Sequence, residues 1–573
     1  MKNFQIARIF NEYADILEIK EDNPFKIRAY RKAAQNLESL TQNIETLAQE
    51  DRLQEIPGIG KDLTEKIKEF LTTGKISSFE ELQKTVPEGV LKMLEIPGVG
   101  PKTAKMLYEK VGIKTIEELE RLARGHKLSG LPGLKDKTEE NILKGIELLK
   151  KGRERMLLGT ALPLAESIIS ELKNLKEVKR ITYAGSLRRM KETIRDIDIL
   201  VTSTHPEKVM DYFVKLPQVK EVLAKGETKS SILTPEGIQV DLRVVEPESF
   251  GSCLLYFTGS KQHNIHLRTI AQKMGLKVSE YGVFVEKTNE NLAKDKEEPE
   301  IYKILGLSYI PPELREDLGE IEAAQKGELP ELVELEDIKG DLHVHSQWSD
   351  GAHNLEELAE GGISRGYEYL AITDHSQSLG IARGLNEERI LKQIAEIKKI
   401  NQKLKNFRLL SGIEVDIRKD GSLDLDKKVL GKLDIVIAAI HTGFKQSKEE
   451  LTKRVLKAFA SGLVTIFAHP SGRLLGEREG YELDYEAIFK IAKEKKIYLE
   501  INAYPQRLDL TDINSRSAKN YGIMLAINTD AHTLTQLDYL RLGVAVARRG
   551  WLTSPNILNC LSLKELLKRL HKG

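Results

Sequence analysis

The 573-residue sequence contains 88 lysines and arginines against 87 aspartates and glutamates, a formal net charge of +1. This balance excludes recognition of nucleic acid by bulk charge, so any such surface must come from local patterning. Cys253 and Cys560 lie far apart and in no metal-type spacing, which argues against a disulfide framework and suits a reducing cytoplasm. Neither a signal peptide nor a membrane-spanning apolar run is found, and we expect a cytoplasmic protein of several domains.

Residues 1–150 are expected to be helical, and a Pro-Gly turn recurs in them. The turn occurs in "LQEIPGIGKDLTEKI" (53–67), in "MLEIPGVGPKTAKML" (93–107) and in a weaker copy at 128–142, where Lys135 replaces the second glycine. A glycine turn that leads into a helix N-terminus exposes backbone N–H groups that suit a phosphate. Such contacts carry no base information, so the pattern indicates sequence-independent DNA binding.

One such turn alone also fits an ordinary helical hairpin, but its repetition favours DNA binding. The segments resemble the helix-hairpin-helix motif of DNA repair proteins. The resemblance implies that DNA, and in some cases a monovalent cation, is bound at the turn glycines. These are Gly58, Gly60, Gly98 and Gly100.

Residues 151–260 combine a helix with apolar, β-branched runs, which predicts an α+β domain. In "DIDILV" Asp196 and Asp198 alternate along a strand, so both carboxylates point to the same side. Like charges side by side need a cation between them, and Asp241 in "IQVDLRVV" offers a third carboxylate from a neighbouring strand. Three carboxylates suit two Mg²⁺ (or Mn²⁺) ions that promote in-line phosphoryl transfer. An Asp-x-Asp pair alone also fits solvated strand-end residues.

Gly185 and Ser186 precede the aspartates and offer a cradle for phosphates, to which Arg188 and Arg189 add positive charge. A Gly-Ser turn followed by this aspartate pair resembles the nucleotidyltransferase superfamily. Further along, "LLYFTGSKQHNIHLR" (254–268) closely resembles the nucleotide-binding segment of family X DNA polymerases, the polymerase beta type.

The family X resemblance implies a role for each residue of this segment. The turn lies against the incoming sugar, so Tyr256 and Phe257 exclude a 2′-hydroxyl and Gly259 allows close backbone approach. Asn264 contacts the base edge of the nucleotide, and Arg268 the template-side minor groove. The triphosphate contacts and the catalytic metal ligands fall on Ser186, Arg189, Asp196, Asp198 and Asp241.

The segments "KIRAYRKAA" and "IPGIGKDLTEKIKEFLTTGK" resemble the small DNA-binding domain of the same family, which grips the 5′-phosphate side of a gap. In some members a lysine there forms a Schiff base with an abasic sugar and cleaves it. The matching position is Lys66, with Lys26 and Tyr30 nearby as DNA contacts. Asp62 and Ser78 stand where lyase-proficient members carry lysines, so Lys66 is either a catalytic amine or a solvated helix lysine.

From residue 340 onward, apolar strands alternate with amphipathic helices, which predicts a βα barrel. Eight of the twelve histidines lie in this part, and six of them end or follow an apolar strand. The C-terminal strand ends of a barrel converge on one face, so these histidines and nearby carboxylates predict a transition-metal site. Any one histidine alone also fits a core residue. The predicted ligands are His343, His345, Asp350, His375, Glu414, His441, His469, Asp530 and His532.

This ligand set resembles the PHP domain (polymerase and histidinol phosphatase), with all nine family positions filled. The resemblance implies up to three Mn²⁺, Zn²⁺ or Fe ions and hydrolysis of a phosphoester. Asp374 either orients a ligand or caps a strand, and Arg383 and Arg473 either bind phosphate or lie on the surface. We do not expect His353 or His571 to be ligands.

The predicted architecture is multidomain, with N-terminal all-α helix-hairpin-helix domains, an α+β nucleotidyltransferase palm and a C-terminal α/β distorted βα barrel. The polymerase resemblance covers about residues 1–315. The expected domains are a small helical DNA-binding domain (1–85), a second helix-hairpin-helix domain (86–150), the palm (151–260), a nucleotide- and template-binding subdomain (261–318), a linker (319–338) and a PHP nuclease domain (339–573).

These resemblances imply a family X DNA-directed DNA polymerase that fills short gaps in base excision repair, using dNTPs on gapped or primer-template DNA. The PHP domain is expected to be a metal-dependent 3′–5′ exonuclease, with abasic-site and 3′-end processing as further activities. One alternative is a nucleotidyltransferase fused to a small-molecule phosphatase of the histidinol-phosphate type. Two others are a polymerase over a non-catalytic PHP scaffold and a DNA-binding module without polymerase activity. We expect a monomer without membrane contact.

Overall fold

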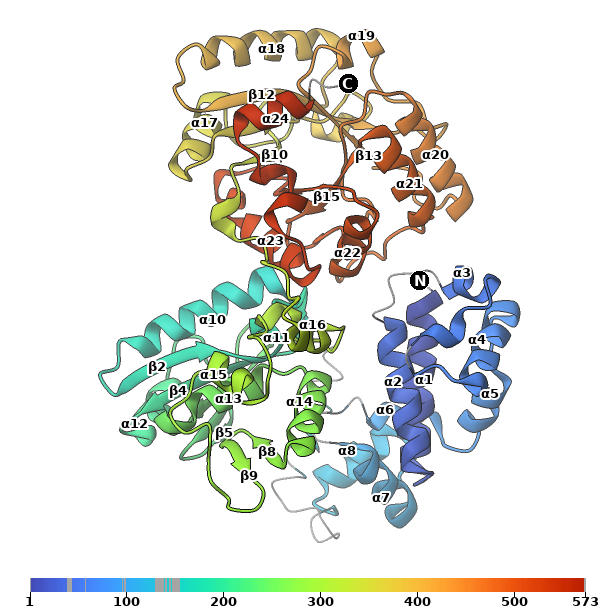
Figure 1. The fold of residues 1–573 in the computed structure, drawn as a ribbon, viewed down its shortest axis with the longest axis vertical. Helices are drawn as coiled ribbons and strands as arrows, with labels where there is room; N and C mark the ends of the chain where they lie inside the picture. The colour runs from blue at the N-terminus through green and yellow to red at the C-terminus, as the bar shows by residue number, and fades with distance from the viewer. Residues whose placement is uncertain are drawn as a thin grey trace. The chain divides into compact units, whose positions relative to one another are not determined.

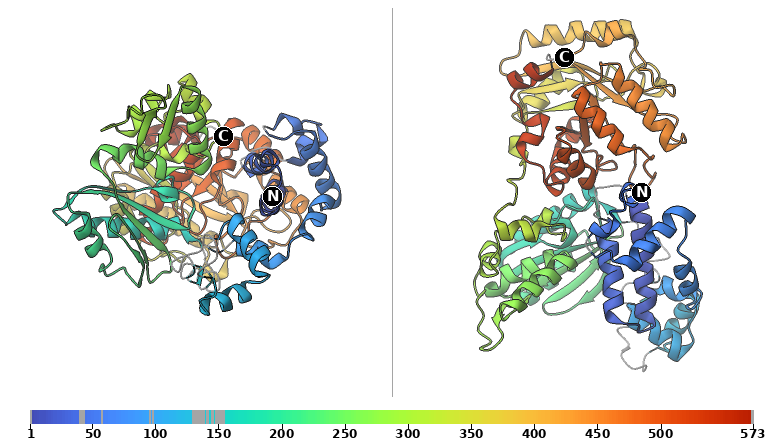
Figure 2. Two further views of the ribbon diagram at one scale, coloured as in Figure 1. Left: turned by 90° about the horizontal axis from the view of Figure 1, so that it is seen from below. Right: turned by 45° about the vertical axis from the view of Figure 1, so that its right-hand side comes forward.

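The computed structural model describes residues 2–38, 44–56, 58–94, 96, 99–128, 139, 142–143, 146 and 155–570. The chain divides into two compact units, Met1–Glu154 and Arg155–Gly573. Figures 1 and 2 show that the described part of the first unit is helical and that both large sheets belong to the second. The predicted fold class, helical domains followed by a palm and a barrel, is therefore confirmed.

The described helices of the first unit enclose one apolar core. Phe10 and Tyr30 are fully buried in it, and the ring of Tyr30 stacks on that of Tyr13 with centroids 4.2 Å apart. The helices are α1 (Lys2–Ile19), α2 (Pro24–Glu38), α3 (Ile44–Gln49), α4 (Lys61–Thr73), α5 (Ser77–Gln83), α6 (Glu88–Met93), α7 (Pro101–Val111) and α8 (Ile116–Arg124).

The first two Pro-Gly turns lead into helices as the sequence predicts. Gly58 has a φ of +80°, in the left-handed region that favours glycine, and α4 begins directly after Gly60. The helix α7 begins directly after Gly100. Gly98 and Lys135, like most of the third turn, lie outside the described residues.

A five-stranded sheet of strand order β2–β4–β7–β6–β5 forms the palm of the second unit. The strands β4 and β7 are parallel neighbours with Asp198 opposite Asp241, whereas the other neighbouring pairs are antiparallel. Ile197 and Ile199 share a core with α10 (Leu158–Lys173) and α12 (Pro206–Phe213), so the alternation of β4 turns its aspartates to the other face. The strands are β2 (Val178–Tyr183), β4 (Asp196–Ser203), β5 (Glu221–Lys225), β6 (Lys229–Leu233) and β7 (Gln239–Val244).

The helices and the hairpin that follow the palm have a core of their own. The predicted linker, 319–338, contains α16 with Ile321 fully buried in that core, because Ile321 and Ala324 give the acidic segment a short apolar face. The elements after the palm are α13 (Phe250–Thr258), α14 (Lys261–Lys273), β8 (Leu276–Ser279), β9 (Gly282–Val285), α15 (Glu298–Ile304) and α16 (Glu320–Lys326).

Seven parallel strands in sequential order form the C-terminal sheet. Its first and last strands approach each other, since His345 N donates to Ala531 O over 2.9 Å and Val344 bridges Ala531. The sheet is therefore a nearly closed barrel, as predicted. The strands are β10 (Gly340–Val344), β11 (Tyr369–Ile372), β12 (Arg408–Asp416), β13 (Ile435–Ala439), β14 (Ile466–Phe467), β15 (Tyr498–Asn502) and β16 (Leu525–Asn528).

One end of the barrel is covered by α24. Its Leu566 packs with Tyr369 and Ile435, the first residues of β11 and β13, so this helix covers the N-terminal strand ends. The C-terminal strand ends are left for the predicted metal ligands. The barrel helices are α17 (Leu355–Ser364), α18 (Glu387–Asn401), α19 (Lys427–Leu430), α20 (Lys448–Ala460), α21 (Tyr485–Lys495), α22 (Asp512–Asn520), α23 (Leu540–Arg549) and α24 (Leu563–Leu570).

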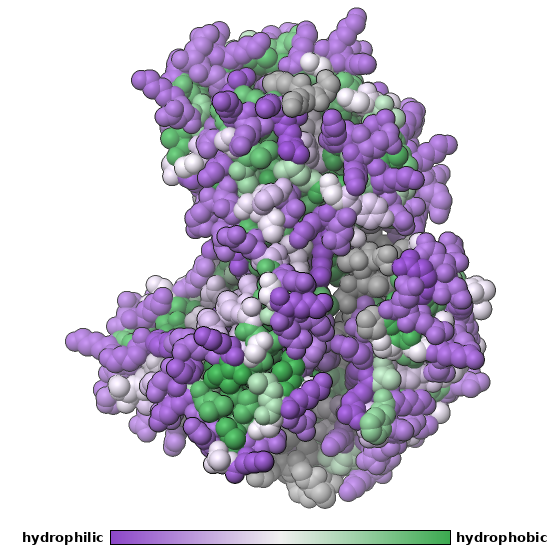
Figure 3. Space-filling view, viewed as in Figure 1, coloured by the Kyte–Doolittle hydropathy of each residue, from purple (hydrophilic) through white to green (hydrophobic). Residues whose placement is uncertain are grey.

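The surface agrees with the composition. Hydrophilic side chains dominate the face drawn in Figure 3, and apolar ones gather in groups between them, the largest of which lies in the lower part of the view. Among the described residues, no helix has the length and apolar content that crossing a membrane requires.

Candidate active sites

The three predicted palm carboxylates lie on neighbouring parallel strands, Asp196 and Asp198 on β4 and Asp241 on β7. Burial and the charges of Asp196 and Asp241 raise the pKa of Asp198 to about 7. Burial also acts to raise the pKa of Asp241, but hydrogen bonds from Lys229 and Gln239 lower it overall. The Asp198 anion is thus disfavoured without a nearby cation, which is the environment expected of a ligand for a hard divalent ion.

A lysine partly fills the cation's role. Lys229 Nζ lies 2.8 Å from Asp241 Oδ2. Among the described residues, groups of three or more ligand atoms within 4.8 Å of one another are found only in the barrel. The oxygens of the three palm aspartates do not form such a group. A divalent ion at all three carboxylates therefore has to displace the Lys229 ammonium and draw the carboxylates together.

A cavity of about 370 Å³ opens beside the aspartates. Ten residues that the sequence assigns to the nucleotide and its metals line it together with Ser260 and Lys261, which the sequence analysis missed. Lys261 has a sequence signal, because it precedes Asn264 and Arg268 by helical spacing on α14. The ten are Gly185, Ser186, Arg189, Asp196, Asp198, Tyr256, Phe257, Gly259, Asn264 and Arg268.

Glycine is required at position 185 because two chain segments meet there. Gly185 opens the short helix α11 (Gly185–Arg188) with a φ of +62°, and a Cβ on it would lie 2.5 Å from Asp198 Oδ2. The backbone before Ser186 thus contacts the carboxylate directly. A side chain at 185 would push the metal ligand and the phosphate cradle apart.

The two arginines of the cradle are held differently. Arg188 pairs with Glu298 through both of its Nη atoms, at 2.9 and 2.6 Å, and donates to Thr258 Oγ1 over 2.8 Å. Its charge is therefore neutralised within the protein, whereas Arg189 lines the cavity. Asn264 Nδ2 donates to the Tyr256 carbonyl over 2.7 Å, while its buried Oδ1 has no hydrogen-bond partner in the described structure. One atom of this amide is thus available to a ligand.

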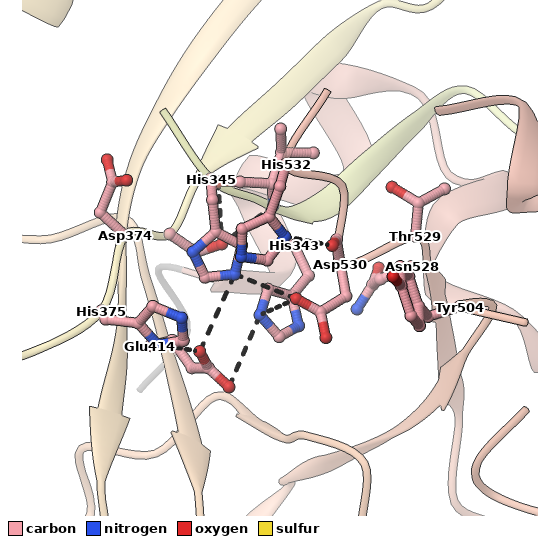
Figure 4. Close-up of polar contacts among 12 residues, drawn as sticks. His343, His345, Asp374, His375, Glu414, Tyr504, Asn528, Thr529, Asp530 and His532 are labelled. Carbon is pink, nitrogen blue, oxygen red and sulfur yellow. Dashed lines mark hydrogen bonds and ion pairs between the residues drawn. The ribbon is translucent and has the colours of Figure 1, made fainter. Parts of the chain in front are cut away.

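All nine predicted barrel ligands converge at the C-terminal strand ends. Glu414 lies at their centre, since His441 Nε2 and His469 Nε2 approach its Oε1 at 3.2 and 2.9 Å (Figure 4 shows the carboxylate directed at the neighbouring imidazoles). Three sets have their ligand atoms within 4.8 Å of one another. The sets are His345, Asp350, His375 and His532; His343, His345 and Asp530; and His375, Glu414 and His441.

The donor atoms of this cluster fit metal ions. His343 Nε2 and His345 Nδ1 are buried and, within the described chain, lack a hydrogen-bond partner. Such atoms are costly to bury unless a ligand satisfies them. Neutral imidazole nitrogens with carboxylate oxygens form the donor set of Zn²⁺, Mn²⁺ and Fe sites.

Two carboxylates behind the ligands escaped the sequence analysis. Glu500 on β15 accepts from His343 Nδ1 over 2.8 Å and from the His469 backbone N over 2.8 Å. Asp416 on β12 accepts from His441 Nδ1 over 2.8 Å. With Nδ1 engaged, each imidazole presents Nε2 to a metal. The only sequence signal is an acidic residue inside an apolar strand, as in "YLEIN".

The contacts of Asp374 and Arg473, for which the sequence allows two roles each, show what each side chain does. Asp374 accepts from Ser346 and Ser349, so it shapes the loop that carries Asp350 rather than approaching a metal. Arg473 pairs with Glu192 at 2.7 Å and donates to backbone carbonyls, which engages it within the protein.

The remaining candidates around the barrel differ in position. Arg383 is exposed, and His353 contacts Glu357 at 3.5 Å, away from the ligand sets. Arg507, which the sequence analysis missed, lies with Nε 3.5 Å from Asp530 Oδ2 and brings a positive charge to the ligands. His571 lies outside the described residues.

In the first unit, Lys66 forms an ion pair with Asp62, and its side chain is 14% exposed. This pair has to break before the amine can act as a nucleophile. Lys26 is paired with Asp22 at 3.8 Å, and Tyr30 is 2% exposed inside the core. Tyr30 thus does not offer DNA a free surface; its place in the apolar pattern of α2 is the physical reason.

The comparisons with known proteins agree with this geometry. Four family descriptions match: Helix-hairpin-helix domain over residues 1–76, SAM-like Helix-hairpin-helix tandem over 90–147, DNA polymerase beta thumb over 253–316 and PHP domain over 341–504. A polymerase beta-type nucleotidyltransferase joined to a PHP barrel is therefore the class of protein that fold and site define.

Relatives narrow this class. The DNA polymerase/3′-5′ exonuclease PolX of Bacillus subtilis (strain 168) is 43% identical over 568 residues, 99% of this chain and 99% of the relative. The DNA polymerase lambda of Arabidopsis thaliana is 27% identical over 55% of this chain and 62% of its own. A probable phosphatase of Thermoanaerobacter sp. (strain X514) is 27% identical over 40% of this chain and 94% of its own. The chain belongs to the PolX family of DNA polymerases, as the sequence motifs predict.

Replacing Glu500 by glutamine is expected to weaken metal binding at the barrel by about 10–100-fold, because the charge that orients His343 is lost. Competition of Mn²⁺ between the protein and a chelator measures this change. The matched control is Glu494→Gln, an exposed glutamate next to Lys495 on α21. Equal Mn²⁺ affinities for the Glu500 variant and the wild type would contradict the positioning role.

Magnesium binding at the palm is expected to strengthen between pH 6 and pH 8, because the pKa of Asp198 is about 7. The native carboxyl holds a proton that the unfolded chain has already lost, so the metal-free palm loses stability as pH rises towards 7. Bound Mg²⁺ replaces that proton. The measurement is the Mg²⁺-induced rise in Tm at each pH in a His343→Ala/His345→Ala background. Equal rises at pH 6 and pH 8, or an unchanged profile in Asp198→Asn, would contradict it.

Proposed function

We propose that this protein fills short gaps in DNA during base excision repair and trims DNA 3′ ends with its barrel. The observation that carries the proposal is the pairing of two sites on one chain. A cavity beside the palm aspartates collects the predicted nucleotide contacts, and a separate cluster of buried ligands occupies the barrel mouth. The name of the Bacillus subtilis relative, DNA polymerase/3′-5′ exonuclease PolX, supports the same two activities.

For polymerisation, Asp196, Asp198 and Asp241 would hold two Mg²⁺ or Mn²⁺ ions, with Asp241 nearest the primer 3′-hydroxyl. When bound, such ions neutralise the developing charge and activate the attacking hydroxyl. Ser186 and Arg189 donate hydrogen bonds to the triphosphate from the wall of the cavity.

The sugar and base are held on the other side of the cavity. Tyr256 and Phe257 in the last turn of α13, and Gly259 directly after it, line the cavity. The bulk of the two aromatic side chains excludes a 2′-hydroxyl and favours dNTPs, and Gly259 allows close backbone approach. The unpartnered amide atom of Asn264 contacts the base edge. Arg268, one helical turn further along α14, contacts the template side.

For 3′-end trimming, the nine barrel residues would hold up to three Mn²⁺, Zn²⁺ or Fe ions. When bound, these ions supply a hydroxide nucleophile and neutralise the phosphate. Glu500 and Asp416 keep His343 and His441 in the tautomer that presents Nε2 to the metal. Arg507 adds positive charge beside Asp530 for a phosphodiester. Abasic-site cleavage and 3′-phosphate removal use the same chemistry.

DNA is held without sequence preference by the turns at Gly58, Gly60, Gly98 and Gly100, where a monovalent cation can assist. Lys26 and Tyr30 belong to the same proposed DNA-binding domain, although burial leaves Tyr30 a supporting role. Lys66 serves as a lyase amine only if DNA breaks its pair with Asp62. We propose a monomer that acts on gapped or primer-template DNA in the cytoplasm.

A second candidate is a nucleotidyltransferase fused to a phosphatase of small molecules. The observation that favours it is the match of a probable phosphatase to 40% of this chain. The cavity-lining residues Tyr256, Phe257 and Gly259 and the helix-hairpin-helix match favour DNA instead. Rates with histidinol phosphate and with a DNA 3′ end distinguish the two.

One gel tests both proposed activities. A 5′-labelled primer in a one-nucleotide gap is incubated with Mn²⁺, with and without dNTPs. Asp196→Ala/Asp198→Ala is expected to lower extension by on the order of 10³-fold while primer shortening continues, because only the palm ligands are lost. His343→Ala/His345→Ala is expected to do the reverse.

The two double variants control for each other, since each removes ligands from one site of the same chain. Loss of both activities in either variant would point to one shared site. A wild-type protein that neither extends nor shortens the primer would contradict the proposal that DNA is the substrate. Small phosphorylated metabolites would then be the substrates to test.

A further inference from the structure

The cavity residue Arg189 is held by a partly buried carboxylate, that of Glu316. Its Nε donates to Glu316 Oε1 over 3.0 Å, and its Nη1 donates to the Thr258 carbonyl at the end of α13. The Arg189 side chain is 13% exposed and the Glu316 side chain 15%. Two of the guanidinium's three nitrogens are thus engaged within the protein, so Glu316 helps to fix the position of the Arg189 side chain that lines the cavity.

Glu316 is itself held by the barrel. Arg549, the last residue of α23, donates from Nη1 to Glu316 Oε1 over 3.1 Å and to the Arg189 backbone carbonyl over 2.9 Å. Its Nη2 lies 2.7 Å from Asp512 Oδ2, and its side chain is 6% exposed. One buried guanidinium therefore contacts both the carboxylate and the backbone that place Arg189.

The position of the Arg189 guanidinium depends on the balance of charge around Glu316. Lys191, Arg189 and Arg549 surround the Glu316 carboxylate, and despite burial they lower its pKa to about 2, so it is an anion at neutral pH. Without Arg549 this anion would be compensated by Lys191 and Arg189 alone, and the Arg189 carbonyl would lose a donor. Both changes draw the Arg189 guanidinium away from a ligand in the cavity.

Two other ion pairs between barrel and polymerase residues do not contact any residue that lines the nucleotide cavity. Arg541 on the same helix pairs with Glu166 at 3.1 Å, with the two side chains 39% and 44% exposed. Arg548 pairs with Glu313 at 2.7 Å. Neither partner lines the nucleotide cavity, so these pairs attach the barrel without reaching the site.

We propose that Arg549 is a positioning residue for nucleotide binding: acting through Glu316 and the Arg189 backbone, it orients the Arg189 guanidinium towards the phosphates of the incoming nucleotide. The barrel is then a structural part of the polymerase site as well as the holder of a second one. The proposal rests on the proposed role of Arg189 as a triphosphate contact.

The test is the steady-state KM for dNTP in one-nucleotide gap filling by the full-length protein. Arg549→Met is expected to raise KM about tenfold with kcat changed less than about threefold, because a ground-state contact is weakened. Arg549→Lys, which keeps one ion pair but not the double contact, is expected to fall between. Arg541→Met is the matched control on the same helix and should leave KM unchanged.

A cycle with Arg189→Ala separates positioning from general stability. If Arg549 acts through Arg189, then Arg549→Met adds nothing to the KM of the Arg189→Ala variant. A merely structural role would give additive effects and would also weaken Mn²⁺-dependent primer shortening. Should the methionine variant fail to fold, by Tm and primer shortening, the lysine variant decides the question.

The outcomes are distinguishable. A wild-type KM in folded Arg549→Met, or in Arg549→Lys when the methionine variant does not fold, overturns this inference alone, provided that Arg189→Ala raises KM. If Arg189→Ala leaves KM unchanged, the assigned role of Arg189 is wrong and the inference falls with it. A wild type that does not extend the primer overturns the proposed polymerase function.

Discussion

Both sites depend on one constraint: several ionisable ligand groups are buried side by side, which is costly unless cations lie between them. At the palm, burial and two neighbouring carboxylates disfavour the Asp198 anion. At the barrel mouth, the fully buried Glu414 stays an anion because the charges of His441 and His375 overcome burial and hold its pKa well below the ordinary value. In the metal-free chain Lys229, and His441 whose pKa the carboxylates of Glu414 and Asp416 raise to about 10 despite burial, take the place of the cations that these ligands require.

Parallel strands explain why such crowding arises twice. Parallel neighbours bring equivalent positions to the same side, as Asp198 and Asp241 show, and barrel strands end at one common mouth. Carboxylates and imidazoles placed at those positions must meet. The apolar alternation of β4 and the almost entirely buried barrel strands supply the free energy that keeps these ligands together without a metal.

The sequence predicted most ligands because their signals are local. The Asp-x-Asp alternation, the "YFTGS" segment and the strand-end histidines need only strand periodicity and chain order. The residues that position the ligands were not predicted, because their contacts depend on which elements become neighbours in the fold. Glu500 contacts His343 across 157 residues of sequence, and Arg549 contacts the Arg189 backbone across 360. No pattern along the chain encodes those contacts.

Prediction from sequence is also limited where one residue type fits two roles. For Asp374 the sequence allows a ligand-orienting or a capping role, and its contacts with Ser346 and Ser349 show that it shapes the loop that carries the ligand Asp350. Tyr30 was predicted as a DNA contact from its motif, yet the same position lies on the buried face of α2. Motif matching finds positions, whereas exposure depends on packing that the motif does not describe.

The central claim is that the palm aspartates and the barrel mouth are two separate, cation-requiring sites on one chain. Anomalous scattering from crystals soaked in Mn²⁺ tests it most directly, since it locates each ion without reference to activity. We predict Mn²⁺ peaks among His343, His345 and Asp530, and separate peaks between Asp198 and Asp241 with Lys229 displaced. Saturating Mn²⁺ that leaves either ligand set without a peak would contradict the account.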